Sequence, residues 1–326
     1  MYRSFKCALI ALMVLSMLTV TALSEQQAED GVKLSLTTGL PTEKAYKPIQ
    51  ISLDNEPGAR PQKGMSHADV VYEFECYTGG PTRYLAVFND DVPETAEGCR
   101  STRVPALEMY WNFGGALAHY GGWAAGKADV NAYIEKLGVD SQFDGMNGSK
   151  HYYRDKKRKM PHNAVAELQD MLADTPEVAE RQMLHFSADS PTVKGEDVKA
   201  FKLTFRKSYV PSFKFSADDN VYYYYFNGKQ AKDGADGTKL AFANVMVIKF
   251  DYSFAEGRSN TPMIDTTGTH TVEYYIGGKH FTGTCERESI FETTTFLDDE
   301  GNEVQFLPGK TYIALPDTAR KIEHTA

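Results

Sequence analysis

The C-terminal part of the chain constrains the fold most, because it consists almost entirely of short strand patterns separated by turns. From about Lys199 onward, aromatic and β-branched residues alternate with polar ones, as over residues 221–226. Alternation of this kind is typical of strands that bury one face. Turns such as the one at residues 227–228, Asn-Gly, separate the strands. The sequence therefore predicts a β-rich C-terminal domain over residues 196–322.

The part of the chain before this region mixes strand and helix patterns. Residues 69–77 and 82–89 alternate as strands around a Gly-Gly-Pro turn, which predicts a hairpin. Glu73 lies on the strand face opposite Tyr72 and Phe74, and it points away from the core if that aromatic face is the buried one. If both faces of the sheet are covered, Glu73 is buried and needs a partner. These patterns predict a mixed α/β domain over residues 36–190 and an α+β chain. Further elements are predicted as a strand over 49–53 and helices over 103–113, 124–137 and 164–173, the last with Asn163 or a neighbour as its cap.

The first residues carry the pattern of an export signal. Arg3 and Lys6 precede an apolar run over residues 7–23, which ends in small residues. This order predicts a cleaved signal peptide over residues 1–24 and a polar tether over residues 25–35. A retained membrane anchor is the alternative, since the apolar run approaches the length that spans a bilayer. After cleavage the chain is expected to be extracytoplasmic, either secreted or associated with the cell envelope, with no membrane span.

Composition and motifs exclude several classes of protein. The formal net charge is -9 and the basic residues are not massed on one segment, so we do not expect nucleic acid as a partner. Residues 308–311, Pro-Gly-Lys-Thr, resemble the end of a phosphate-binding loop, but the first glycine is missing and no helix pattern follows. The cysteines and histidines do not have the spacing of a metal site. We therefore expect no cofactor and no metal.

Three cysteines remain after the predicted cleavage, namely Cys76, Cys99 and Cys285. An extracytoplasmic location permits a disulfide. Cys76–Cys99 is the favoured pair, because only a hairpin and a short loop separate the two residues. A chain without any disulfide is the equal alternative.

The stretch over residues 98–123 carries most of the candidate functional residues. A short apolar strand pattern over residues 115–118 leads into His119, and Gly121-Gly122 follows. A strand that ends in a polar residue beside glycines is where α/β folds place sites, because the strand fixes the position and glycine lets a ligand approach the backbone. The basic run at residues 149–160 is either a solvated loop or a positive rim of this site.

Arginines and histidines around this stretch form the richest constellation in the sequence. Arginine forks match carboxylates and phosphates, and histidine transfers protons near neutral pH. Ser101 is a nucleophile only if His119 or His162 reaches it, and is otherwise expected to cap a helix. Structural ion pairs are the alternative for the whole set, and no catalytic residue is assigned. The candidate ligand-binding residues are Glu73, Arg83, Arg100, Ser101, Arg103, His119, Arg154, His162 and Asn163.

In these same runs the sequence resembles the YerB-like proteins, a bacterial family defined as domain of unknown function 3048. The order and spacing of the runs are specific when taken together. The resemblance covers roughly residues 36–180 and continues more weakly at residues 244–245 and 307–311. The matching runs are residues 38–41, 60–62, 68–73, 82–83, 86–88 and 100–103, His119 with Gly121-Gly122, then residues 144–145, Arg154 and residues 161–163.

The resemblance implies a two-domain protein of the cell envelope but no established activity. The sequence departs from the family pattern in three places. Glu97-Gly98-Cys99 stands where members usually have Gly-Pro-Val, and Trp123 stands where a small residue commonly follows the glycine pair. Many members also carry a lipidated cysteine, whereas Cys7 lies too early in this chain to be one after cleavage.

The leading hypothesis is a binding protein of the envelope. Its first domain holds an anionic ligand with Arg100, Arg103 and Arg83, and Glu73 and His119 orient that ligand, which is a cell-wall fragment or polymer or an envelope protein. The alternative is a hydrolase or transferase that uses His119 or His162 as general acid/base with Glu73. A third reading is a structural protein that docks through the two exposed members of the tyrosine row at residues 222–225.

Overall fold

The computed structural model describes residues 32–77, 80–124, 126–139, 141–254 and 261–325. The predicted signal peptide at residues 1–24 and most of the predicted tether lie outside this part of the chain. Strands predominate strongly over helices, so the protein is mostly β.

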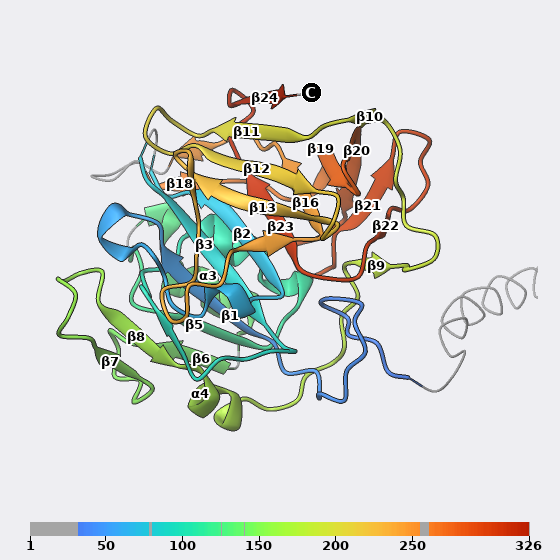
Figure 1. The fold of residues 1–326 in the computed structure, drawn as a ribbon. Helices are drawn as coiled ribbons and strands as arrows, with labels where there is room; N and C mark the ends of the chain where they lie inside the picture. Colours follow the sequence, from blue (N-terminus) through green and yellow to red (C-terminus); the bar gives the residue numbers. More distant parts are fainter. Residues whose placement is uncertain (1–31, 78–79, 125, 140, 255–260, 326) are drawn as a thin grey trace, which may run out of the picture.

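An eleven-stranded sheet runs through the molecule and combines strands from both halves of the chain (Figure 1). Strand β23 pairs in parallel with β2 on one side and with β16 on the other. A strand from near the C-terminus thus lies beside the hairpin of the N-terminal half. In order across the sheet, the strands are β10 (Glu196–Asp197), β20 (Lys279–Arg287), β19 (Gly268–Ile276), β16 (Asn244–Ile248), β23 (Thr311–Leu315), β2 (Val70–Glu75), β3 (Thr82–Phe88), β1 (Ile49–Asp54), β5 (Ala116–His119) and β6 (Ser141–Asp144), with β21 (Thr295–Asp298) beside β20.

A second, six-stranded antiparallel sheet packs on one face of the first. Aromatic rings fill the space between the sheets. The ring centroids of Phe201 and Tyr275 lie 3.5 Å apart, and those of Phe213 and Tyr312 lie 4.9 Å apart. The strands of this sheet are β14 (Lys229–Gln230), β13 (Val221–Phe226), β12 (Pro211–Ser216), β11 (Ala200–Thr204) and β24 (Lys321–Thr325), with β15 (Ala241–Phe242) beside β13.

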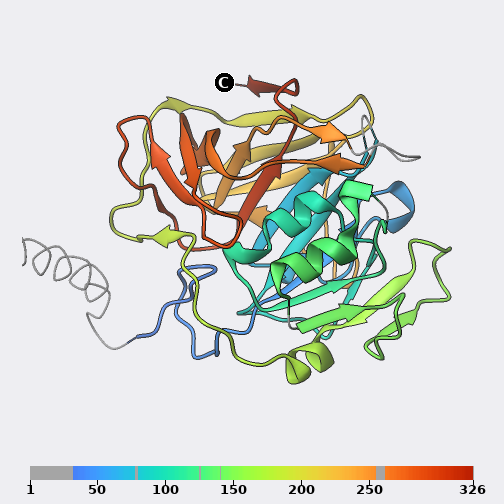
Figure 2. The ribbon, with the colours of Figure 1, turned by 180° about the vertical axis from the view of Figure 1, so that it is seen from behind.

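Short helices cover part of the opposite face of the large sheet (Figure 2). Ala106 and Met109 pack there in one cluster with Tyr72 and Phe74 of β2. Both faces of the sheet are therefore covered at β2 and β3, which explains why every residue of these two strands is buried. The helices are α2 (Val104–Glu108), α3 (Val130–Leu137) and α4 (Leu168–Asp174), and the 3₁₀ turns are η1 (Pro57–Ala59), η2 (Met65–His67), η3 (Tyr110–Asn112) and η4 (Gly126–Ala128).

Three smaller sheets complete the fold. Among the residues that the structure describes, no helix has the length and hydrophobicity needed to cross a bilayer. The smaller sheets consist of β4 (Thr95–Glu97), β8 (Ala164–Glu167) and β7 (Tyr152–Arg154), of β17 (Ser253–Phe254) with β18 (Pro262–Met263), and of β22 (Gln305–Phe306) with β9 (His185–Phe186).

The predicted helix at residues 164–173 is wrong in its first turn. Residues 164–167 form the strand β8 instead, which pairs with β4 and β7, and the helix α4 begins only at Leu168. Asn163 does not cap this helix. Its side-chain amide donates to the carbonyl of Asp155, and its Oδ1 accepts a hydrogen bond from Arg154.

The other predicted helices are shorter than their patterns suggest. The helix predicted over residues 103–113 is divided into α2 and η3. The helix predicted over residues 124–137 begins at Val130, because the Asp129 carboxylate caps it by accepting from the backbone N–H groups of Asn131 and Ala132. Strand β1, the hairpin β2–β3 and strand β5 are present as predicted.

The predicted Cys76–Cys99 disulfide is wrong, and Cys76, Cys99 and Cys285 are all free and buried. The backbone N–H of Cys76 donates to the carbonyl of Pro81 beside the β2–β3 hairpin, whereas the backbone of Cys99 forms an isolated β-bridge with Leu53 of β1. Since the strand order is β2-β3-β1, about three strand spacings, roughly 14 Å, separate the two cysteines. A disulfide needs Cα atoms less than about 7 Å apart. Burial raises the pKa of the Cys99 thiol to about 12.

Candidate functional site

Three parallel strands end side by side, and each carries a polar residue at its carboxyl end. These strands are β1, β5 and β6, and they end in Asp54, His119 and Asp144. The segment after β4 crosses this edge, because the Arg100 N–H donates to Ser52 and the Arg100 carbonyl accepts from Tyr120. The fold therefore gathers residues of the candidate site at the carboxyl edge of parallel strands, where α/β sheets commonly place ligands.

Asp54 is the centre of the first cluster at this edge. Its side chain is almost completely buried, and its Oδ2 accepts hydrogen bonds from Arg100 Nε at 3.2 Å and His162 Nδ1 at 2.8 Å. The guanidinium of Arg100 also lies 4.0 Å from the Glu56 carboxylate. Arg100 is thus an ion-paired residue. Sequence analysis did not select Asp54 as a site residue, because the residues around it indicate a loop. Its position directly after a predicted strand was the signal that could have identified it.

Arg83 and Arg103 form a second cluster with a different character. Their exposed fractions are 2% and 6%, and neither forms an ion pair with a carboxylate within the described part of the chain. Arg83 Nη1 donates to the carbonyl of Ser101 at 2.5 Å. Arg103 donates to the carbonyl of Thr102 at 2.8 Å and to the hydroxyl of Tyr77 at 3.0 Å. Burial and the charge of Arg83 together lower the pKa of Arg103.

Two polar atoms in this cluster are buried and have no hydrogen-bond partner among the described residues. They are Nε of Arg103 and the hydroxyl oxygen of Thr102. Unsatisfied buried groups of this kind are uncommon and cost about 1–3 kcal/mol each.

Ser101 has neither of its predicted roles. Its hydroxyl donates to the carbonyl of Tyr120 at 3.2 Å, and both candidate base histidines have other partners. The N-cap position of α2 is Arg103, so Ser101 does not cap that helix.

His119 is completely buried and both of its ring nitrogens are engaged. Nδ1 lies 2.9 Å from the carbonyl oxygen of Gly121, which can only accept, so Nδ1 carries the proton. Nε2 therefore accepts from the side-chain amide of Gln142, at 2.9 Å. Burial lowers the pKa of His119, although the Asp144 carboxylate 3.8 Å away opposes this shift.

Glu73 lies away from this edge, in the core between the two large sheets. Its carboxylate accepts hydrogen bonds from Asn55 at 3.0 Å, from Thr82 at 2.5 Å and from the hydroxyl of Tyr312. Burial raises its pKa to about 7. The predicted pairing of Glu73 with His119 or His162 is wrong, because each of the three has other partners.

Arg154 and Asn163 form a separate pair. Arg154 Nη1 donates to Asn163 Oδ1 at 2.8 Å, and its guanidinium lies over the ring of Tyr120, 4.6 Å from the centroid. The basic run that includes Arg154 forms part of β7 and the turn after it, and Arg158 of this run pairs with Glu97 at 3.0 Å.

A cavity of about 610 Å³, which we call the basic cavity, lies where η1 meets the ends of β13 and β14. Three cationic side chains and one carboxylate line it, namely Arg60, Arg206, Lys229 and Glu56. The guanidinium of Arg60 lies over the ring of Phe226, 3.9 Å from its centroid. Sequence reasoning did not select these three cations as site residues, because they are far apart in the chain, and Arg60 entered only as part of a run that matches the family.

The basic cavity is adjacent to both arginine clusters. Tyr77 lines the cavity, and its hydroxyl accepts the hydrogen bond from Arg103 behind it. Glu56 lines the cavity and is the second carboxylate near Arg100.

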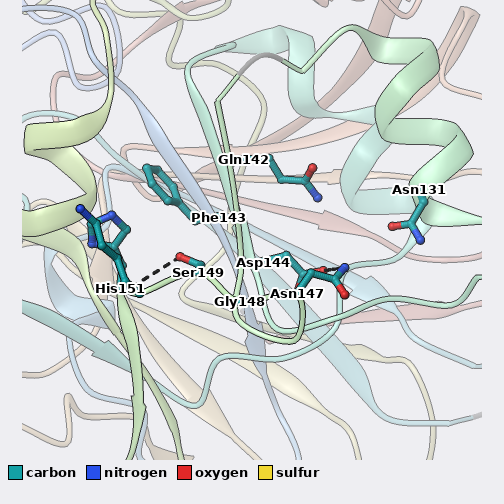
Figure 3. Close-up of a pocket in the computed structure, with 9 residues that line it drawn as sticks. Asn131, Gln142, Phe143, Asp144, Asn147, Gly148, Ser149 and His151 are labelled. Atoms are coloured by element: carbon teal, nitrogen blue, oxygen red, sulfur yellow. Dashed lines mark hydrogen bonds between the residues drawn. The ribbon is translucent and has the colours of Figure 1, made fainter.

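A second cavity of about 500 Å³, which we call the amide cavity, lies at the carboxyl end of β6. Figure 3 shows the amides of Asn131, Gln142 and Asn147 around one part of this space, and Ser149 and His151 around another. Nowhere in the described ranges do three His, Cys, Asp or Glu side chains gather closely enough to hold a metal ion.

Comparisons with known proteins place this fold in a family. Residues 37–181 match the N-terminal domain, and residues 201–313 the C-terminal domain, of "Protein of unknown function (DUF3048)". The protein "Putative lipoprotein YerB" of Bacillus subtilis (strain 168) is 25% identical over 302 residues, which cover 86% of this chain and 85% of that protein. The crystal structure of YerB from Bacillus subtilis superposes with a TM-score of 0.75 at 21% identity, over 89% of this chain and 99% of that chain. The chain therefore belongs to the DUF3048 family, whose two domains it contains in order.

Proposed function

We propose that this protein is an extracytoplasmic, envelope-associated binding protein that holds an anionic ligand in the basic cavity. The signal pattern at residues 1–24 and the similarity to a protein named as a lipoprotein support the location. An anionic fragment or polymer of the cell wall, or an acidic region of an envelope protein, has the required chemistry.

The buried pair Arg83–Arg103 is the observation that carries this proposal. A buried cation is ordinarily paired, because desolvation of an unpaired charge costs several kcal/mol. Here two guanidinium groups lie close enough to depress the pKa of one of them, and neither has a carboxylate partner in the described ranges. An anion from outside the chain would supply the missing charge.

The basic cavity is the place where such an anion comes close to the positive charges of Arg83 and Arg103. Its lining carries three cations against one carboxylate, within a chain whose net charge is -9. Tyr77 connects the cavity to Arg103, and electrostatic attraction is stronger in a partly desolvated site than in water. In this proposal Arg60, Arg206 and Lys229 contact the ligand. Arg83 and Arg103, which are buried and do not line the cavity, stabilise the negative charge of the ligand electrostatically.

The roles of the other predicted site residues change under this proposal. Arg100 is neutralised by Asp54 and Glu56, so its role is to hold the carboxyl edge of β1 together. Glu73 lies in the core and does not orient a ligand.

Isothermal titration with inorganic phosphate and with tripolyphosphate tests the proposal. We expect wild type to bind tripolyphosphate, and Arg103→Met and the double variant Arg60→Ala/Lys229→Ala to bind it at least about tenfold more weakly, which corresponds to about 1.4 kcal/mol. The matched control is Arg320→Met, which removes an arginine that is paired with Glu75 and does not line the cavity. Equal affinities in all four proteins, or no binding by wild type, would overturn the proposal.

A second candidate function, acid–base catalysis, rests on the Asp54–His162 pair. A carboxylate oxygen 2.8 Å from Nδ1 orients the imidazole, as a general base requires. Incubation with peptidoglycan fragments, followed by mass spectrometry, tests this function. Products formed by wild type and by the control His185→Asn but not by His162→Asn would support it, and the absence of product from wild type would contradict it.

We also propose that the two family regions correspond to two structural halves. Residues 36–190 would form the mixed α/β half, which contains the helices, and residues 196–322 the β-rich half. The shared eleven-stranded sheet supports a single folding unit built from these halves.

A further inference from the structure

The amide cavity shares no lining residue with the basic cavity and has different chemistry. Its lining is dominated by uncharged hydrogen-bonding groups. The one buried carboxylate among them, Asp144, already accepts from the N–H groups of Gly121 and Met146 and from the amide of Asn147. Lys150 and His151 both pair with Asp174. Asp144, Lys150 and His151 therefore each have partners within the protein.

A buried histidine fixes the orientation of one amide of this cavity. His119 is completely buried, and its Nδ1 proton is held by the Gly121 carbonyl, so its Nε2 can only accept. Gln142 must then present an N–H to His119, which leaves its Oε1 and its second N–H for the cavity. An exposed glutamine ordinarily samples several rotamers, whereas this one is pre-oriented.

Two further amides complete the arrangement. The side chain of Asn131 makes no hydrogen bond with the described residues, and Figure 3 shows it across the space from Gln142. Asn147 donates to Asp144 at 2.6 Å, and the carboxylate thereby orients this amide. The cavity thus offers two amides that hydrogen bonds hold in place, those of Gln142 and Asn147, and faces them with the amide of Asn131.

We propose that the amide cavity binds an uncharged, polyhydroxylated group, namely a neutral sugar residue of a glycan. Each sugar hydroxyl both donates and accepts, so neighbouring hydroxyls match the oxygen and N–H of a planar amide without any charge. Gln142 and Asn131 are the binding residues, and His119 is the positioning residue that acts through Gln142. This site is independent of the anionic ligand of the basic cavity.

Titration calorimetry with cellotriose and chitotriose, two neutral oligosaccharides, tests the inference on the full chain. We expect wild type to bind at least one of them, and Gln142→Ala and Asn131→Ala each to weaken binding about tenfold, the effect of losing roughly one or two hydrogen bonds. Both residues are exposed, so these variants are expected to fold. Gln169→Ala, an exposed glutamine on α4 outside the cavity, is the matched control.

The positioning role of His119 has its own readout. His119→Gln retains an acceptor for the amide of Gln142 and is expected to bind within about threefold of wild type, whereas His119→Leu is expected to resemble Gln142→Ala. Equal loss in both His119 variants would overturn the positioning role. Absence of binding by wild type, or unchanged affinity in Gln142→Ala and Asn131→Ala, would overturn the site itself. The double variant Arg60→Ala/Lys229→Ala, whose two positions line the basic cavity and not the amide cavity, is expected to bind the sugars normally, which separates this test from that of the anion site.

Discussion

At the scale of single residues, burial decides which polar side chains can serve a ligand. Residue types and spacing identified Arg83, Arg100, Arg103 and His119, but these residues have different surroundings. Arg100 has Asp54 as its counter-charge, whereas Arg83 and Arg103 pair with no carboxylate among the described residues and donate instead to backbone carbonyls and the Tyr77 hydroxyl. The sequence could not distinguish them, because the partner of Arg100 lies 46 positions away and is brought there by strand pairing.

Glu73 gives a prediction at this scale. Burial raises its pKa from the ordinary value of 4.5 to about 7 in the folded protein. The folded state therefore binds a proton more tightly than the unfolded state, so this residue stabilises the fold at low pH and loses that effect as pH rises from about 4.5 to about 7. The free energy of unfolding of wild type minus that of Glu73→Gln should fall by roughly 1.4 kcal/mol per pH unit in this window.

Urea unfolding at several pH values measures this difference. Asp69, whose pKa burial also raises to about 7, contributes equally to both proteins and cancels in the subtraction. Glu43→Gln changes an exposed glutamate and is the control that should show no such trend. A difference between wild type and Glu73→Gln that stays constant from pH 4.5 to 8 would show that Glu73 is ionised throughout.

At the scale of elements, local patterns were reliable where a strand or turn is specified by neighbours in sequence. The hairpin β2–β3 and the strand β5 are of this kind. The error at residues 164–173 arose because apolar residues at helical spacing are also compatible with a short strand, and pairing with β4 and β7 determined the outcome. The disulfide prediction failed for a related reason, since closeness in sequence did not imply adjacent strands.

The start of β5 gives a prediction at this scale. Gly114 and Gly115 both have positive φ, of 65° and 80°. A Cβ on Gly115 would lie 2.1 Å from the carbonyl oxygen of Pro48, which accepts the first hydrogen bond of β5, whereas a Cβ on Gly114 meets nothing closer than 3.5 Å. Gly115→Ala should therefore destabilise the protein by about 2 kcal/mol more than Gly114→Ala. Chemical denaturation of the two variants checks this, and equal losses would mean that the contact relaxes without cost.

At the scale of the whole molecule, the shared sheet is the feature that sequence analysis missed. The two halves are visible as a change of pattern, but the pairing of β23 with β2 joins residues more than two hundred positions apart and leaves no local signature. The same non-local pairing buries Glu73 against Tyr312 and brings Phe226 beside Arg60. Both the core glutamate and the basic cavity therefore depend on contacts that no single segment encodes.

This architecture predicts one cooperative unit. Calorimetry of residues 25–326 should give a single transition with equal calorimetric and van't Hoff enthalpies. Residues 25–190 alone should fail to fold stably, because removal of β23 exposes an edge of β2 and one face of the large sheet. Two separate transitions in the longer chain, or a cooperatively folded shorter one, would show that the halves are independent domains.

We propose above that the basic cavity, with the buried Arg83 and Arg103 behind it, holds an anionic ligand. A crystal structure of residues 25–326 soaked with tripolyphosphate tests it most directly. We expect anion density in the basic cavity, in contact with Arg60 and with at least one of Arg206 and Lys229. A cavity without anion, with density only at lattice contacts, would contradict the claim and leave the arginine pair as part of the scaffold.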